Sequence, residues 1–97
     1  MKYEIIFAPE AIRDLKRLSA RNRSIIGDAI EKHLRVEPDK VSKSRIKRLH
    51  GIRRPQYRLR VDDIRVFYDI VETDVEILAI VEKPDVAAWL AEMGETE

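Results

Sequence analysis

Apolar residues in the first half of the chain follow a strand-like spacing and then a helical one. Residues 2–7 are rich in β-branched and aromatic side chains, which predicts a strand. Apolar residues then recur at helical spacing over 9–18 and again over 25–34, with a break at 19–22. We therefore expect two amphipathic helices packed as an antiparallel hairpin, followed by a polar loop over 37–45.

The second half changes to a period of two, which is typical of strands. The pattern predicts strands over 56–61, 64–71 and 75–82, a short strand or a loop over 48–51, and a final helix over 86–93. The expected order is β-α-α-β-β-β-α. This order indicates an α+β fold in which a helical hairpin covers one face of a mostly antiparallel sheet. The length of 97 residues supports a single domain over 1–97.

Asp62 and Asp63 are expected at the tip of a hairpin between the first two of these strands. Paired residue numbers then sum to 125, so that Arg60 faces Arg65. Alternation places six residues on the buried face: Tyr57, Leu59, Val61, Ile64, Val66 and Tyr68. The other face carries Arg58, Arg60, Arg65 and Phe67.

Two arginines directly opposite one another are destabilising unless an anion or a carboxylate relieves their repulsion. Arginines beside an exposed phenylalanine suit phosphates with a stacked base alongside. In the alternative interpretation, Glu76 and Glu82 on the next strand neutralise these arginines.

Charge is strongly polarised along the chain. Residues 40–65 hold 10 basic and 2 acidic side chains, whereas residues 66–97 hold Lys83 against 9 acidic ones, although the net charge of the whole chain is only +1. Such a basic block indicates a polyanionic partner. The alternative is that the block pairs with the acidic C-terminal part within the fold or in a dimer.

Several kinds of chemistry are missing from the sequence. There is no cysteine, the three glycines lie far apart, and His33 and His50 lack the spacing of metal ligands. We therefore expect no metal and no cofactor, so that any catalysis would depend on arginine, lysine or tyrosine. With no signal peptide and no apolar run long enough for a membrane span, we expect a cytoplasmic protein.

Four sequence segments resemble the RelE/ParE superfamily, the toxins of type II toxin–antitoxin pairs. These are Phe7-Ala8-Pro9-Glu10-Ala11, the block Lys47-Arg48-Leu49-His50-Gly51, Tyr57-Arg58-Leu59-Arg60-Val61, and Ile64-Arg65-Val66-Phe67-Tyr68. The resemblance covers nearly the whole chain. It implies a ribosome-dependent endoribonuclease that cuts mRNA in the A site without metal or cofactor and is bound by a cognate antitoxin. The alternatives are a ParE-like inhibitor of DNA gyrase or a catalytically silent relative.

The resemblance also implies roles for individual residues. Arg58, Arg60 and Arg65 match catalytic positions, and Lys83 stands near a position where RelE-like enzymes have arginine or histidine, but the final helix has no tyrosine. RNA contacts are expected from Arg45, Lys47, Arg48, His50, Arg53, Arg54 and Phe67. Antitoxin contacts are expected from Val86, Trp89 and Leu90, although helical spacing also favours Trp89 as a core residue.

Overall fold

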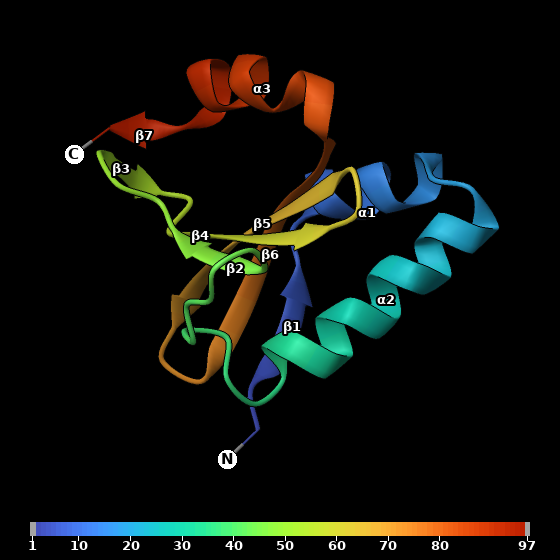
Figure 1. The fold of residues 1–97 in the computed structure, drawn as a ribbon, viewed down its shortest axis with the longest axis horizontal. Coiled ribbons are helices and arrows are strands. Elements are labelled where there is room, and N and C mark those ends of the chain that lie inside the picture. Colours follow the sequence, from blue (N-terminus) through green and yellow to red (C-terminus); the bar gives the residue numbers. More distant parts are fainter. Residues whose placement is uncertain (1, 97) are drawn as a thin grey trace.

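The computed structural model describes residues 2–96, in which a helical hairpin and a short C-terminal helix pack on a central sheet (Figure 1). The first half contains β1 (Glu4–Phe7), α1 (Pro9–Arg17) and α2 (Ala20–Leu34). The strands that follow are β2 (Ile46–Arg48), β3 (Ile52–Arg54), β4 (Tyr57–Val61), β5 (Ile64–Val71) and β6 (Asp74–Glu82). The chain then forms a 3-10 turn, η1 (Lys83–Asp85), the helix α3 (Val86–Met93) and β7 (Glu95–Thr96).

The main sheet has five strands in the order β1-β6-β5-β4-β2. All its neighbouring pairs are antiparallel except β1 and β6, which run parallel. The expected α+β class is therefore confirmed. The structure adds β3 and β7, which pair with each other in a small second sheet. Two to three residues per strand are too few to leave a periodic signal in the sequence.

The structure refines two details of the predicted elements. Residues 48–51 were expected as a short strand or a loop, and the loop is confirmed: β2 ends at Arg48, and residues 49–51 connect it to β3. The break between the helices is limited to residues 18–19. The Ser19 hydroxyl accepts a hydrogen bond from the Asn22 amide at 3.1 Å, so Ser19 caps α2 and the helix begins at Ala20.

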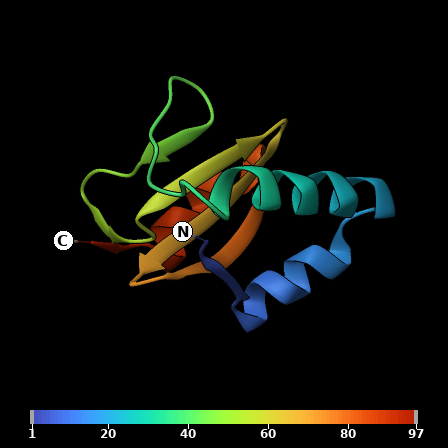
Figure 2. The same cartoon turned by 90° about the horizontal axis from the view of Figure 1, so that it is seen from below.

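The larger core lies between the helical hairpin and one face of the sheet (Figure 2). Its fully buried residues include Ile26 and Leu34 of α2 and Leu59, Val66 and Tyr68 of the strands. The opposite face carries a smaller core in which α3 covers Phe67, Ala79 and Val81. Both faces of β5 are therefore buried, which explains why only Ile70 and Val71 at its end have more than slight exposure.

The β4–β5 hairpin has the predicted register. Val61 pairs with Ile64, Arg60 with Arg65, and Tyr57 with Tyr68, so paired numbers sum to 125. Asp62 adopts a left-handed conformation with φ of 54°. This conformation allows a two-residue connection without glycine, because Asp tolerates positive φ better than most residues.

Gly94 ends α3. Its amide donates to the Leu90 carbonyl at 2.8 Å, and a Cβ at this position would lie 2.5 Å from the same oxygen. The chain then enters β7, where Glu95 forms an ion pair with Arg53 of β3 at 2.7 Å. The segment that follows α3 is thus fastened to β3. None of the helices in residues 2–96 is long and apolar enough to cross a membrane.

Candidate nucleic-acid interface

Four cations gather on one face of three neighbouring strands. Lys47 of β2 lies directly opposite Arg58 of β4, and Arg60 of β4 lies directly opposite Arg65 of β5. Directly paired residues in an antiparallel sheet point to the same side. We call these four residues the basic sheet face. Arg45 lies at its edge, where its carbonyl accepts a hydrogen bond from the Arg60 amide at 2.8 Å.

Within residues 2–96, no carboxylate forms an ion pair with the basic sheet face. The ion pairs formed within residues 2–96 use five other cations: Arg17, Arg35, Lys40, Arg53 and Arg54. The Nε atom of Arg58 is buried without a hydrogen-bond partner. Burial lowers the pKa of Arg58, and the positive charges of Arg65 and Arg60 lower it further. Two opposed like-charge pairs without counterions make this face a place where an anion would relieve repulsion.

Arg65 and Arg60 have different surroundings. Arg65 is only 8% exposed, and its guanidinium donates to the carbonyls of Asp62 at 2.8 Å and Ile64 at 3.3 Å. It braces the β4–β5 turn and contributes its charge from inside the sheet. Arg60 is exposed and lines a cavity of about 190 Å³ together with Ser44, Arg45 and Asp62. Arg60 therefore offers the freer guanidinium of the two.

Three predicted RNA-binding arginines lie elsewhere. Arg48 sits on the opposite face of the sheet, 5.2 Å from the centroid of the Tyr57 ring, and donates to the Gln56 carbonyl at 2.8 Å. Arg53 is paired with Glu95. Arg54 binds Asp69 at 2.6 Å and Glu76 at 2.8 Å.

For Arg53 and Arg54, then, the alternative of internal pairing holds. Glu76 neutralises Arg54 and not the arginines of the basic sheet face. His50 is exposed, in the turn before β3. The structure places no acidic side chain against it within residues 2–96.

The prediction that Phe67 is exposed beside the arginines is wrong. Its ring is 0% exposed and stacks on Trp89 with centroids 4.8 Å apart. Phe67 therefore cannot stack on a base in this structure, because α3 occupies the position above it. Strand alternation correctly separated the two faces, but it could not show that a helix covers part of the second one.

The three predicted antitoxin contacts form the underside of α3. Val86, Trp89 and Leu90 pack against the smaller core and remain partly exposed. The helical spacing that favoured Trp89 as a core residue is thus confirmed. The indole Nε1 is buried without a hydrogen-bond partner in residues 2–96.

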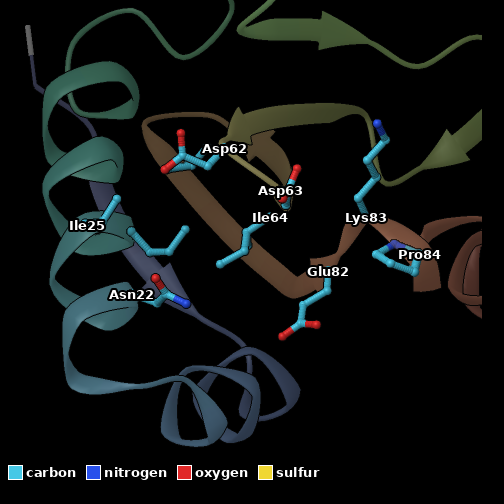
Figure 3. A pocket seen from close by; sticks show the side chains of 10 residues that line it. Asn22, Ile25, Asp62, Asp63, Ile64, Glu82, Lys83 and Pro84 are labelled. Atoms are coloured by element: carbon cyan, nitrogen blue, oxygen red, sulfur yellow. The ribbon is translucent and has the colours of Figure 1, made fainter.

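Lys83 lies beside the β4–β5 turn, where its amide donates to the Asp63 carbonyl at 2.7 Å. It lines a cavity of about 460 Å³ between α2, this turn and the end of β6 (Figure 3). Figure 3 shows the Lys83 and Glu82 side chains pointing in opposite directions. Lys83 forms no ion pair with the described carboxylates, so its charge is available.

Sequence reasoning missed the pairing of Lys47 with Arg58 and the role of Asp69. The carboxylate of Asp69 accepts from Arg54 and, at 2.7 Å, from the Gln56 amide. The Gln56 side chain in turn accepts from the Ile70 amide at 2.9 Å. This network attaches residues 54–56 to β5 and so fixes the connection between β3 and β4. A lone aspartate within an apolar strand was the only signal for it.

The order of the elements and the helical hairpin over one face of the sheet agree with the fold implied by the resemblance to the RelE/ParE superfamily of toxins. A family model described as the ParE toxin of the type II toxin–antitoxin system, parDE, matches residues 5–83. The chain belongs to this family. The resemblance inferred from the sequence is therefore confirmed. No curated protein sequence matches the chain.

The chain is similar to chains of several solved toxin–antitoxin complexes. The chain is similar to a chain of the RelBE2 complex of Mycobacterium tuberculosis, with 27% identity, a TM-score of 0.66 and coverage of 84% of this chain and 99% of that one. It is also similar to a chain of the RelB–RelE complex of Methanococcus jannaschii, with 20% identity, a TM-score of 0.66 and coverage of 87% and 96%. A chain of the Escherichia coli RelBE complex matches at 14% identity, a TM-score of 0.54 and coverage of 82% and 95%.

Proposed function

We propose that this toxin cleaves mRNA on the ribosome and that the basic sheet face binds the RNA phosphates around the scissile bond. The proposal depends on two cross-strand pairs of like charge, Lys47 opposite Arg58 and Arg60 opposite Arg65. Neither pair has a carboxylate partner in residues 2–96. Like charges directly opposite one another destabilise a sheet, and a bound polyanion would relieve their repulsion.

In the proposed reaction the ribose 2′-oxygen attacks the adjacent phosphorus. A bond forms between these two atoms, and the bond from phosphorus to the 5′-oxygen of the next nucleotide breaks. The proton of the 2′-hydroxyl passes to water, and the leaving 5′-oxygen takes one from water. Arg58 and Arg60 stabilise the charge that develops on the phosphoryl oxygens, Arg65 holds the turn that positions them, and Lys83 adds charge beside it.

This arrangement predicts modest cleavage rates, because residues 83–93 contain neither tyrosine nor histidine for proton transfer. General acid–base catalysis typically contributes a factor of about 10² to 10⁴. Tyr68 does not fill the gap, since its hydroxyl is buried against the Pro38 carbonyl at 2.6 Å and burial raises its pKa.

A second candidate function is inhibition of DNA gyrase. The family model that matches the chain describes ParE, and the missing tyrosine weakens the case for a nuclease. On this alternative the basic sheet face is a binding surface without chemistry.

We also propose a cognate antitoxin as the protein partner. The similar solved structures are toxin–antitoxin complexes, and the apolar α3 offers Val86, Trp89 and Leu90 as a partly exposed contact surface. Binding there would change Trp89 fluorescence, and an unaltered spectrum at saturating antitoxin would contradict this contact.

The deciding experiment maps breaks in a defined mRNA on programmed ribosomes by primer extension. We expect cuts within the A-site codon that are absent on naked mRNA. Arg60→Met should reduce cleavage by more than tenfold, because it removes an exposed guanidinium from the basic sheet face. Arg21→Met is the matched control, since Arg21 is exposed on α2 and forms no ion pair within the described chain.

Intact mRNA with folded wild-type protein would refute the nuclease proposal. The next measurement would then be a gyrase supercoiling assay with the same two variants. Inhibition that is lost in Arg60→Met but kept in Arg21→Met would assign the basic sheet face to gyrase inhibition.

A further inference from the structure

One edge of the main sheet is incomplete. Strand β1 pairs with β6 only from Asp74 to Ile77, because the chain turns into α1 at Pro9. The rest of β6, up to Glu82, extends beyond the end of β1 and has β5 as its only neighbour in the sheet. This half-edge of β6 faces α1 and leaves backbone groups without a strand partner.

The direction of these groups follows from the hydrogen bonds on either side. The Lys83 amide donates to the Asp63 carbonyl at 2.7 Å, toward the β4–β5 turn, whereas the Ile80 amide donates to the Asp14 carboxylate of α1 at 2.9 Å. Backbone groups of alternate residues point to opposite sides of a strand. The Glu82 amide therefore points with that of Ile80, away from β5, and no residue in 2–96 accepts a hydrogen bond from it.

The same edge lines a cleft of about 470 Å³, to which α1 and α3 also contribute residues. The apolar residues that line the cleft, which we call its floor, are Leu18, Ile80, Val81, Ala88 and Trp89. Its rim carries five carboxylates and a single cation, Arg17: the carboxylates are Glu10, Asp14, Glu82, Asp85 and Glu92. Among the ion pairs formed by the described residues 2–96, Asp14 is the only one of these five carboxylates that takes part, with Arg17 at 3.4 Å. The cleft thus has the opposite charge to the basic sheet face.

We infer that this cleft binds an extended, arginine- or lysine-bearing segment of a protein partner, which adds to the sheet along the open half-edge of β6. The segment's backbone pairs with the strand, its cationic side chains reach the unpaired carboxylates of the rim, and its alternate apolar side chains face the floor. Addition of an extended peptide to a sheet edge is a common mode of recognition because main-chain hydrogen bonds are already aligned.

The free groups favour a parallel orientation. In a parallel pair, one residue of the added strand donates to the carbonyl before its opposite residue and accepts from the amide after it. A residue opposite Val81 would bond the Ile80 carbonyl and the Glu82 amide in this way. The added segment would then run in the direction of β1, in a ladder of its own, because the β5–β6 register shifts between Ile77 and Ala79.

The test uses the full-length protein and a blocked hexapeptide in which arginine and valine alternate. We expect binding that weakens with salt, a change in Trp89 fluorescence, and at least tenfold slower hydrogen exchange of the Glu82 amide in the complex. A peptide with glutamate in place of arginine should not bind. Binding of the arginine peptide without protection of the Glu82 amide would overturn edge pairing, and failure to bind would overturn the site.

Two substitutions at one position separate charge from backbone. Glu82→Gln removes one rim carboxylate and keeps the amide, so we expect two- to threefold weaker binding. Glu82→Pro also removes the amide donor, and φ of −71° at this residue suits proline, so we expect a loss of more than tenfold. If both variants weakened peptide binding equally, the loss would be due to the carboxylate alone, and pairing with the Glu82 amide would be contradicted.

Two controls complete the experiment. Asp28→Asn changes charge by the same amount on the exposed surface of α2 and should leave binding unchanged. Arg60→Met should also leave it unchanged, which separates this site from the proposed RNA-binding face. If Glu82→Pro does not fold, protection of the Glu82 amide in the wild-type protein still decides the question.

Discussion

Asp69 anchors the loop between β3 and β4, and its replacement by alanine provides a stringent test of how this small fold is held together. One carboxylate oxygen accepts from Arg54 Nε at 2.6 Å and the other from the Gln56 amide at 2.7 Å. The Asp69 side chain is 6% exposed, whereas that of Arg54 is 44% exposed. Asp69→Ala therefore leaves one partly buried amide without its partner and one arginine that water can still solvate.

The magnitude follows from these two losses. A hydrogen bond to a buried charged group contributes about 1.5–3 kcal/mol, and the stranded Gln56 amide falls in this range. The pair with Arg54 is discounted to about 1 kcal/mol, because solvent screens its exposed partner. We expect Asp69→Ala to reduce the free energy of unfolding by about 3 kcal/mol, which lowers Tm by roughly 15 °C in a domain of this size.

Urea unfolding followed by circular dichroism measures this change. Asp69→Asn should cost less, about 1–2 kcal/mol, because an amide oxygen can still accept from Gln56. Asp28→Ala is the matched control, since this exposed carboxylate forms no ion pair in the described chain and its loss should change stability by less than about 0.5 kcal/mol. A cost below 1 kcal/mol for Asp69→Ala would refute the argument that this carboxylate anchors the loop.

Two further predictions concern charge. Arg58→Met removes a partly buried cation whose Nε has no hydrogen-bond partner, so we expect a Tm equal to or above that of the wild type. We also expect weaker polyanion binding, with the slope of log K against log salt concentration smaller by about 0.7 for one lost phosphate contact. A lower Tm would show that the guanidinium stabilises the fold. Burial lowers the pKa of His33 below 6.5, and the charges of Arg45 and Lys32 lower it further. As the pH falls, His33 therefore takes up its proton in the unfolded chain before it does so in the folded protein. The free energy of unfolding should accordingly decrease as the pH drops below about 6.5. Thermal unfolding at pH 7.5 and 5.5 checks this, and His33→Gln should reduce the difference; an equal difference in the variant would exclude His33 as its cause.

Local patterns in the sequence were sufficient for most of the fold. The alternation around Asp62-Asp63 predicted the β4–β5 register, and with it the pairing of Arg60 with Arg65, because a two-residue turn and a buried apolar face together leave one register. The pairing of Lys47 with Arg58 was not predictable in the same way. Strand β2 has only three residues and is joined to β4 through β3, so no short turn sets its register.

Long-range contacts decided the remaining errors. Phe67 has the alternation of an exposed residue, and only the packing of α3 from about 20 residues later buries it. The sequence did not show that Arg53 and Arg54 form ion pairs, because their partners are distant in the chain. Arg53 pairs with Glu95, and Arg54 pairs with Asp69 and Glu76. Composition could show that carboxylates were available, but not which cations they would reach.

The parallel pairing of β1 with β6 sets the order in which this protein can be completed during its own synthesis. Glu4 meets Asp74 and Phe7 meets Ile77, so each partner of β1 is made 70 residues later. At elongation rates of about 5–20 residues per second, β1 waits roughly 4–14 s for β6. Until then the sheet lacks an edge, and the core under the helical hairpin lacks the side chains that β6 contributes, Val75, Ile77 and Ile80. The main sheet therefore cannot be completed before the ribosome has translated the message through the codon of Ile77.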